Sequence, residues 1–267
     1  MPAVAEFLHS HGGDILHADQ HQDVSQGVCL MRVEWTLEGF DLTPDLFPAK
    51  FSTLAETLRM NWRVEYSEVP ARVALFVSRE DHCLLDLLHR WRSGELRCEI
   101  MLIISNHEDA RSLAAFYGVP FHHIPVNSAD RIEGERQQLQ LLEENHIDLL
   151  VLARYMQILS SDFVARYPGR IINVHHSFLP AFIGARPYQA AYERGVKLIG
   201  ATSHYVTAEL DKGPIIEQDV TRISHQYELD DLKEKGRDVE RMVLSRAVRW
   251  HLEHRVVVYG NKTIVFG

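Results

Sequence analysis

The sequence has few cysteines, no long apolar run and no excess of basic residues. Its cysteines, Cys29, Cys83 and Cys98, lie far apart and form no C-x-x-C pair, which disfavours a disulfide framework and a cysteine-based zinc site. No segment offers about 18 uninterrupted apolar residues for a membrane span, and the first residues carry Glu6 and no basic leader. We therefore expect a cytoplasmic protein in a reducing compartment.

Acidic residues outnumber basic ones, 37 to 28, which gives a formal net charge of −9. Such a surface repels a phosphate backbone, so we expect no nucleic-acid partner, while small anionic substrates stay possible. The chain of 267 residues is 46% hydrophobic and has no low-complexity tract. This composition predicts a globular protein with one large or two moderate domains.

Residues 1–68 form the first predicted domain, a small α+β unit. The stretch PAVAEFLHSHGG predicts an amphipathic helix that ends at two glycines, and VCLMRVEW predicts a strand with apolar residues at alternating positions. A helix is expected over residues 44–60. The stretch WRVEYSEVP, residues 62–70, predicts a further strand that ends at Pro70. The expected order is helix, strand, strand, helix, strand.

Residues 69–267 form the second predicted domain, of the α/β class. Strand-like runs alternate with helical spans: ARVALFVS, EIMLIIS, FHHIPV, IDLLVLA and RIINVHH. This alternation predicts a mostly parallel sheet wound with helices, whose ligands bind at the carboxyl ends of the strands. A helix near 229–253 and a hairpin with an Asn-Lys turn are expected to follow.

Polar residues follow the last of these apolar runs, in INVHHSFLPAFIGARP, residues 172–187. Asn173 and His175 are two apart, so on a strand both side chains point to one face. Asp211 lies further on, in the turn LDKGP, where Gly213 is expected to take a positive φ angle. Each feature alone is typical of a cap or a turn. Their combination indicates a reactive site.

Three segments carry a resemblance to a known family. The runs NVHHSFLPAFIGARPY, GATSHYV and LDKGPIIEQ resemble the folate-dependent formyltransferase family, and the likeness covers nearly the whole chain. The Asn-x-His signature of that family is met by Asn173 and His175, and its later catalytic aspartate by Asp211. The resemblance implies a Rossmann-like formyltransferase domain. It also implies that the first domain, with GGDILHADQHQD, is a ferredoxin-like unit of ACT type that lacks its first strand.

The resemblance further implies a folate substrate and the segment that binds it. LARYMQILS, residues 152–160, resembles the segment whose backbone holds the pterin ring, so the expected substrate-binding residues are Met156, Gln157, Ile158 and Leu159. The substrate implied is 10-formyltetrahydrofolate. No separate cofactor and no metal are expected.

The expected chemistry suits these residue types. A formyl group on an arylamine nitrogen is an amide, and attack on its carbon creates an oxyanion that needs preorganised donors. Asn173 and His175 can donate to it. Asp211, when ionised near His175, favours the imidazolium form and can take the proton from an attacking water.

Other polar residues near the motif have two interpretations. Thr202 and His204 are two apart on the strand before Asp211, so both are expected to face one side of the sheet and to order the water, with core packing as the alternative for Thr202. His176 should point away from His175 and is interpreted as structural. Arg186, where the family commonly shows asparagine, is interpreted as a solvated surface residue, with contact to a glutamate tail as the alternative.

The acceptor of the formyl group separates the activities of the family. Members that formylate glycinamide ribonucleotide carry a glycine-rich loop after the first strand, whose backbone amides bind the phosphate. Residues 78–84 of this chain contain no glycine and include Glu80 and Asp81, which repel a phosphate. The acidic net charge and the absence of a C-terminal domain disfavour a transfer-RNA acceptor. Water is therefore the expected acceptor, and the expected reaction is hydrolysis to formate and tetrahydrofolate.

Two alternatives stay open. The chain could transfer the formyl group to an amine such as glycinamide ribonucleotide, or it could bind folate as a regulatory protein without turnover. The missing first strand of the ACT-like unit leaves amino-acid regulation open and exposes a sheet edge, so we expect a homo-oligomer in which a second subunit covers this edge.

Overall fold

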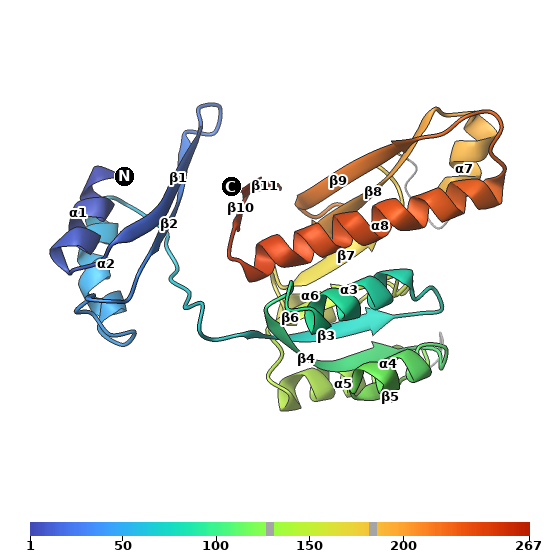
Figure 1. Cartoon of the computed structure of the whole chain (residues 1–267), viewed down its shortest axis with the longest axis horizontal. Coiled ribbons are helices and arrows are strands. Elements are labelled where there is room, and N and C mark those ends of the chain that lie inside the picture. The colour runs from blue at the N-terminus through green and yellow to red at the C-terminus, as the bar shows by residue number, and fades with distance from the viewer. Residues whose placement is uncertain (127–130, 182–185) are drawn as a thin grey trace. The chain divides into compact units, whose positions relative to one another are not determined.

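The computed structural model describes residues 1–126, 131–181 and 186–267. It divides into two compact units (Figure 1): unit 1 consists of Met1–Ser67 with Ile264–Gly267, and unit 2 consists of Glu68–Thr263. The expected boundary after residue 68 thus differs by one residue, and the last four residues group with unit 1. Within the described ranges, every helix is too short or too polar to cross a membrane.

Unit 1 packs two helices on a two-stranded antiparallel sheet. Its elements are α1 (Pro2–Ser10), β1 (Ile15–Asp23), β2 (Val28–Trp35) and α2 (Phe47–Thr57). The apolar faces of both helices form the core, in which Leu8, Phe47 and Phe51 are buried. Gly12 has a φ of +77°, and a Cβ there would lie 2.3 Å from the carbonyl oxygen of Gly39, which explains why α1 ends at a glycine pair.

The strand predicted over residues 62–70 is wrong. These residues are all described, and they form neither helix nor strand. A strand exists through hydrogen bonds to a neighbouring strand, and β1 and β2, the strands that lie wholly within the described part of unit 1, pair with each other. Trp62 and Val64 instead pack against the apolar cluster of the two helices. The alternation of apolar residues in this stretch therefore reflects packing against the core, without the backbone hydrogen bonds of a strand.

Unit 2 is built on a sheet that has seven strands among the described residues, in the order β5-β4-β3-β6-β7-β8-β9. The strands of this sheet are β3 (Ala71–Val77), β4 (Cys98–Ser105), β5 (Phe121–His123), β6 (Leu149–Leu152), β7 (Ile171–His175), β8 (Leu198–Tyr205) and β9 (Ile215–Arg222). The helices are α3 (His82–Arg92), α4 (Arg111–Tyr117), α5 (Arg131–Glu144), α6 (Ser161–Arg166), α7 (Pro187–Arg194) and α8 (Leu229–Leu252).

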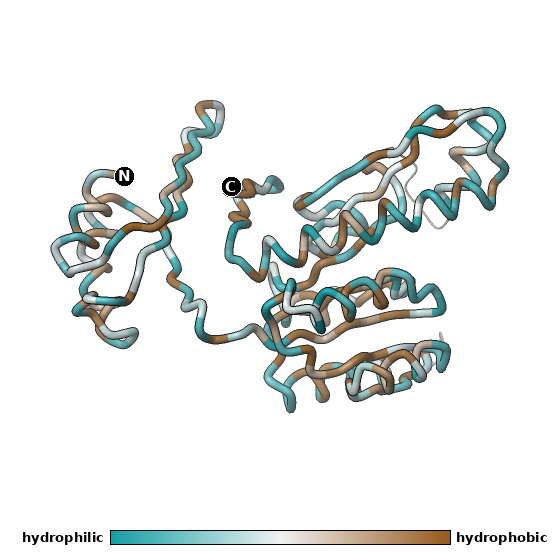
Figure 2. Tube along the Cα trace, in the orientation of Figure 1, coloured by the Kyte–Doolittle hydropathy of each residue, from teal (hydrophilic) through white to brown (hydrophobic). Residues whose placement is uncertain are grey.

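The predicted α/β class with a mostly parallel sheet is confirmed. Strands β3 to β7 are parallel, and β8 and β9 add to them as an antiparallel edge. Helices α3 and α4 contact each other, and α5 and α6 both contribute buried residues to the core cluster that includes Phe76 and Leu102 of the sheet. Helix α8 packs beside α3 and across β7, β8 and β9 (Figure 1). The central strands are mostly apolar along their length (Figure 2), as is typical of strands covered on both faces.

The C-terminal hairpin is present, but its turn differs from the prediction. Strands β10 (Val256–Tyr259) and β11 (Lys262–Val265) pair with each other, so the turn residues are Gly260 and Asn261. Gly260 has a φ of +57°. Glycine adopts this conformation without a steric penalty, which explains why the turn forms one residue earlier than Asn-Lys.

Candidate active site

Two strands bring the predicted site residues together. Asn173 and His175 lie at the carboxyl end of β7, and the antiparallel strand β8 places His204 opposite Asn173 and Thr202 opposite His175. Directly opposed residues on one face of an antiparallel pair have neighbouring side chains. The strand register therefore makes one polar cluster from residues about thirty positions apart.

Asp211 reaches this cluster from the turn between β8 and β9. Its φ is +54°, a left-handed conformation that aspartate and asparagine adopt more readily than most residues. The expectation that Gly213 takes the positive φ is wrong, because Gly213 is absent from the described positive-φ residues. Gly213 is needed for space: a Cβ there would lie 1.7 Å from the carbonyl oxygen of Tyr205.

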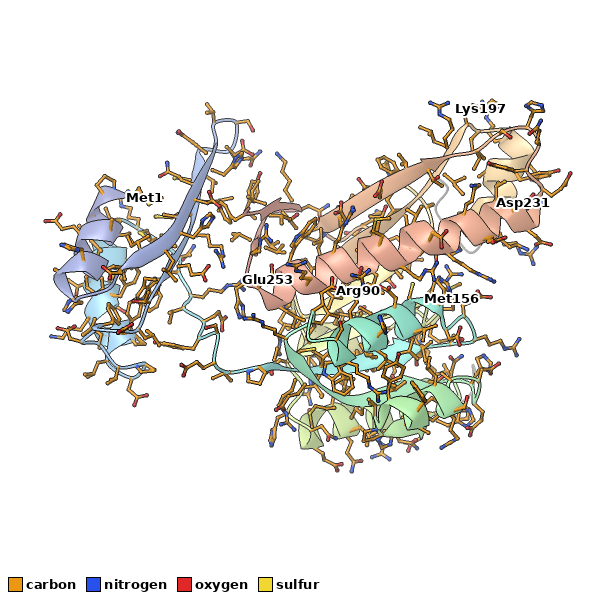
Figure 3. The ribbon with its side chains drawn as sticks, viewed as in Figure 1. Met1, Arg90, Met156, Lys197, Asp231 and Glu253 are labelled. Atoms are coloured by element: carbon orange, nitrogen blue, oxygen red, sulfur yellow. The ribbon has the colours of Figure 1, made fainter. Side chains whose placement is uncertain are left out.

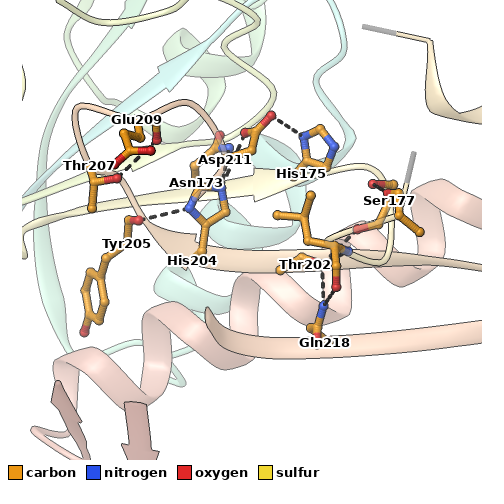
Figure 4. Close-up of polar contacts among 12 residues, drawn as sticks. Asn173, His175, Ser177, Thr202, His204, Tyr205, Thr207, Glu209, Asp211 and Gln218 are labelled. Atoms are coloured by element: carbon orange, nitrogen blue, oxygen red, sulfur yellow. Dashed lines mark hydrogen bonds and ion pairs between the residues drawn. The ribbon is translucent and has the colours of Figure 1, made fainter. Parts of the chain in front are cut away.

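The carboxylate of Asp211 points at two histidines (Figure 4). Oδ2 lies 3.4 Å from Nδ1 of His175, and Oδ1 lies 3.7 Å from Nε2 of His204. The Asp211 side chain is only 7% exposed. Asn173 completes the cluster, with Nδ2 at 3.2 Å from the same Nε2 of His204. Asn173 and His175, which the spacing predicted to share one face, thus converge with Asp211, to which the resemblance pointed.

Both ring nitrogens of His204 have polar neighbours. Its Nδ1 lies 3.0 Å from the backbone carbonyl oxygen of Tyr205, which only accepts, so Nδ1 carries a proton. Nε2 faces both the amide of Asn173 and the carboxylate of Asp211. His204 therefore belongs to the cluster that holds Asp211.

The pKa of Asp211 lies below its ordinary value of 3.8. Burial alone raises this pKa, but the hydrogen-bonding contact with His204 and the charge of His175 outweigh it, with a smaller contribution from His176. Asp211 is thus ionised at neutral pH. An ionised carboxylate at this position stabilises a positive charge on the neighbouring imidazoles.

Thr202 lies on the same face of the sheet as His204, but the hydrogen bonds described for its hydroxyl go to the chain after β7 and to Gln218 of β9. Its hydroxyl donates to the carbonyl oxygen of Ser177 at 2.8 Å and accepts from the backbone N–H of Leu179 at 3.0 Å and from Nε2 of Gln218 at 2.9 Å. The residue is fully buried. The hydroxyl thus uses its one donor and both acceptor positions to hold the chain after β7 and Gln218 in place. The alternative of a packing role therefore describes Thr202 better than water ordering.

The predicted pterin-holding segment, residues 156–159, follows β6 at the same edge of the sheet. Leu152 pairs with Asn173, so the chain leaves β6 beside the start of the polar cluster. Met156, labelled in Figure 3, and Ile158 are 50% and 59% exposed, whereas Leu159 packs against the core. Gln157 is half-buried. Exposed apolar side chains at the carboxyl edge of a parallel sheet suit contact with a flat aromatic ligand.

The remaining predicted residues lie around this edge. His176 is buried, and its ring centroid lies 5.3 Å from that of His175 and 5.6 Å from that of Tyr188, so the two histidine rings are neighbours although His176 was expected to point away; its structural role stays a prediction. Arg186 is exposed at the start of α7, next to the undescribed residues 182–185 that include the Gly-Ala pair of the motif.

The loop after β3 runs directly into α3 without a glycine. Asp81 is the N-cap residue of α3, and the carboxylate of Glu80 lies 3.0 Å from Nη2 of Arg237. Part of the negative charge predicted to repel a phosphate is thus paired. Asp81 makes no side-chain hydrogen bond to the backbone amides of α3, but its carboxyl group stands next to the helix N-terminus that a phosphate would use.

Sequence reasoning missed a second polar cluster, which surrounds Glu240 of α8. Its side chain is 1% exposed and contacts His82, Arg154 and Tyr188. One signal was available: Glu240 interrupts the apolar stripe of α8, with Val239, Val243 and Leu244 buried beside it. A charge on the apolar face of a helix predicts a buried partner.

Comparison with known proteins gives a family match over most of unit 2. The profile of the formyl transferase family matches residues 71–248. A formyltetrahydrofolate deformylase of Synechocystis sp. is 57% identical over 264 residues, which cover 98% of this chain and 92% of the relative. A formyltetrahydrofolate deformylase of Bacillus subtilis is 52% identical over 265 residues, 99% of this chain and 88% of the relative.

Solved structures with the same fold extend the comparison. The crystal structure of a formyltetrahydrofolate deformylase from Pseudomonas syringae superposes with a TM-score of 0.97 at 48% identity and covers 100% of this chain and 89% of its own. Glycinamide ribonucleotide transformylase 1 from Symbiobacterium toebii superposes with a TM-score of 0.70 at 29% identity and covers 78% of this chain and 99% of its own. The predicted Rossmann-like formyltransferase fold is confirmed.

Proposed function

Since this chain belongs to the formyl transferase family, we propose that the acceptor of its formyl group is water. The chain hydrolyses 10-formyltetrahydrofolate to formate and tetrahydrofolate, and it is a hydrolase of a linear amide C–N bond. The observation that carries this conclusion is the match, at 50% identity or more over nearly the full length, to relatives named formyltetrahydrofolate deformylase. Transfer to an amine acceptor is not favoured by these matches.

The polar cluster supports a mechanism for this hydrolysis. A water oxygen attacks the formyl carbon, and negative charge develops on the formyl oxygen. The amide of Asn173 and the imidazole of His175 can donate to that oxygen. Asp211, ionised at neutral pH, takes the proton from the water, and its contact with Nε2 of His204 holds the carboxylate in place. The bond between the formyl carbon and nitrogen breaks, and the proton held by Asp211 passes to that nitrogen, which gives tetrahydrofolate and formic acid, ionised to formate at neutral pH.

The loop after β3 supports water as the acceptor. Glu80 and Asp81 directly precede α3, so two carboxyl groups stand in the loop before the backbone amides that an amine acceptor with a phosphate would need. Water needs no such site. The same fold at 29% identity is found in a glycinamide ribonucleotide transformylase, so the fold alone leaves the acceptor open, and the acidic loop is the feature of this chain that disfavours a phosphate.

The wider role is also a proposal. We propose that the released formate and tetrahydrofolate supply purine biosynthesis and balance the one-carbon folate pool in the cytoplasm. We further propose that unit 1 is a regulatory unit of ACT type and that the protein is a homo-oligomer. Light scattering gives the oligomeric state, and activity titrations with glycine and methionine test regulation.

The experiment for the acceptor compares two incubations of the purified protein with 10-formyltetrahydrofolate, with and without glycinamide ribonucleotide. We expect formate and tetrahydrofolate in both, at the same rate, and no formylated nucleotide by mass spectrometry. Formylglycinamide ribonucleotide appearing as fast as formate contradicts the proposal. Tight folate binding with no formate in a single turnover identifies a binding protein instead.

A further inference from the structure

A second buried carboxylate lies in the middle of α8, outside the Asp211 cluster. Three elements of unit 2 send side chains to Glu240. Nε2 of His82 from α3 lies 2.8 Å from Oε2, the hydroxyl of Tyr188 from α7 donates to Oε1, and Nε of Arg154 lies 3.4 Å from Oε2. Figure 1 shows α3 and α8 side by side, so the carboxylate is enclosed between helices and the end of β6.

Glu240 carries its charge in this buried place. Burial alone raises the pKa of Glu240, but the hydrogen bond from His82 and the charge of Arg154 outweigh it, and the pKa lies below its ordinary value. The carboxylate is thus ionised at neutral pH. A buried ion is tolerated when it is paired, and removing one partner leaves the other charge uncompensated. Arg154, whose side chain is 11% exposed, is therefore tied to Glu240.

A metal site is the competing interpretation of this place. Potential ligand atoms of His82, Cys83 and Glu240 lie within 4.8 Å of one another. However, burial and the nearby Glu240 raise the pKa of Cys83 well above its ordinary value, so its thiol keeps its proton. The guanidinium of Arg154 already neutralises the carboxylate and repels a second cation. The geometry therefore favours an ion pair over a metal ion.

Arg154 stands at the start of the folate-binding segment in a strained conformation. Its φ is +63°, and Met156 two residues later has a φ of +59°. For a side chain of this size the left-handed region costs about 1–2 kcal/mol per residue. Such a conformation persists where the surroundings hold it. Here the backbone N–H of Ser78 donates to the carbonyl oxygen of Arg154 at 3.2 Å, and Glu240 holds the side chain.

We propose that Glu240 and Arg154 are positioning residues for folate: the ion pair between α8 and the end of β6 holds Arg154 in its left-handed conformation and so orients residues 156–159 toward the substrate. This inference rests on the proposed function, in which residues 156–159 contact the pterin ring. The contacts described for the two residues lie outside the Asp211 cluster, where the formyl group is proposed to react. Loss of the pair therefore weakens folate binding and leaves the Asp211 cluster intact.

The test uses the whole chain with matched substitutions. Glu240→Gln and Arg154→Gln keep the size of the side chain and remove one charge, and Arg154→Lys keeps the charge. Glu143→Gln is the control, because Glu143 forms an exposed ion pair with Arg166 at 2.5 Å. The measurements are KM and kcat for 10-formyltetrahydrofolate, the Kd for tetrahydrofolate, and the melting temperature of each variant.

We expect both glutamine variants to raise KM and Kd about tenfold or more with kcat within about threefold, which is a loss of binding without a loss of chemistry. Arg154→Lys and Glu143→Gln should stay within about threefold in all constants. A purely structural role lowers the melting temperature and the active fraction and leaves KM and Kd unchanged.

KM and Kd within about twofold of the wild type in folded Glu240→Gln and Arg154→Gln samples overturn the inference. If Glu240→Gln does not fold, the comparison of Arg154→Gln with Arg154→Lys gives the same answer. A wild-type protein that binds tetrahydrofolate but releases no formate refutes the proposed function instead, while the Kd comparison still tests the positioning role.

Discussion

Replacement of Asp211 by asparagine is the most informative perturbation of the candidate site. The two side chains have the same shape, and asparagine tolerates the φ of +54° found at this position. The substitution therefore removes the charge and the proton-accepting oxygen while the turn keeps its backbone. Asp211→Ala lacks this advantage, because alanine is disfavoured in the left-handed region by about 1–2 kcal/mol.

The size of the effect can be worked out from the contacts of Asp211. A unit charge 3.4 Å from Nδ1 of His175 interacts with a protonated imidazole by about 5 kcal/mol at an effective dielectric constant of about 20. General-base catalysis contributes about a hundredfold to ten-thousandfold, or about 2.7–5.4 kcal/mol of barrier. The two figures have the same order of magnitude. We therefore expect Asp211→Asn to lower kcat at least about a hundredfold.

Formate release under saturating 10-formyltetrahydrofolate measures kcat, and titration with tetrahydrofolate measures binding. The Kd of Asp211→Asn should stay within about threefold of the wild type, because residues 156–159 supply the folate contacts in the proposed site. Asp230→Asn is the control, since Asp230 is 92% exposed and pairs only with the surface residue Lys233 among the contacts described for it. A kcat within about threefold of the wild type would remove Asp211 from the mechanism.

The other predictions concern stability and pH. Thr202→Val should lower the free energy of unfolding by about 1–3 kcal/mol in urea titrations, because it leaves the N–H of Leu179 without its hydrogen-bond acceptor. Ser203→Ala is the control, because it removes a buried hydroxyl that has no hydrogen bond to any described residue, and it should change the free energy of unfolding by less than about 0.5 kcal/mol. Gly236→Ala places a Cβ 2.0 Å from Oη of Tyr188 and should lower the melting temperature. The control Gly134→Ala on α5 meets atoms no nearer than 3.7 Å and should leave the melting temperature unchanged. Equal melting temperatures for the two variants would contradict the packing described around Glu240. Because the pKa of Asp211 is lowered in the folded state, its ionised form contributes stability above pH 3.8, and this contribution disappears as the pH falls through the folded-state pKa. The difference in unfolding free energy between wild type and Asp211→Asn should therefore become smaller from pH 7 to pH 3. A difference that becomes larger over this range would contradict a lowered pKa of Asp211 in the folded state.

Local patterns in the sequence were sufficient for much of the fold. Apolar runs such as those of β3, β4 and β6 are covered on both faces, so composition alone marks them as strands of a parallel sheet. The spacing of Asn173 and His175 determines that both side chains share one face, because side chains alternate along any strand. The resemblance to the family pointed to Asp211. These features depend on neighbours within a few residues or on a motif.

Tertiary structure alone decided the features that depend on distant partners. Residues 62–70 have a strand-like pattern but no neighbouring strand, so they form none. Thr202 and His204 have the same strand and spacing, yet the loop after β7 takes all hydrogen bonds of Thr202, while the turn after β8 brings Asp211 to His204.

The Glu240 cluster makes the same point about charge. The sequence by itself determined that a carboxylate interrupts the apolar stripe of α8, but its partners come from α3, α7 and the end of β6. Tyr188 is 52 residues from Glu240 in the chain, and His82 is 158 residues from it. Periodicity carries information over one or two helical turns, whereas the pairing of a buried charge is set by which elements the packed sheet brings together.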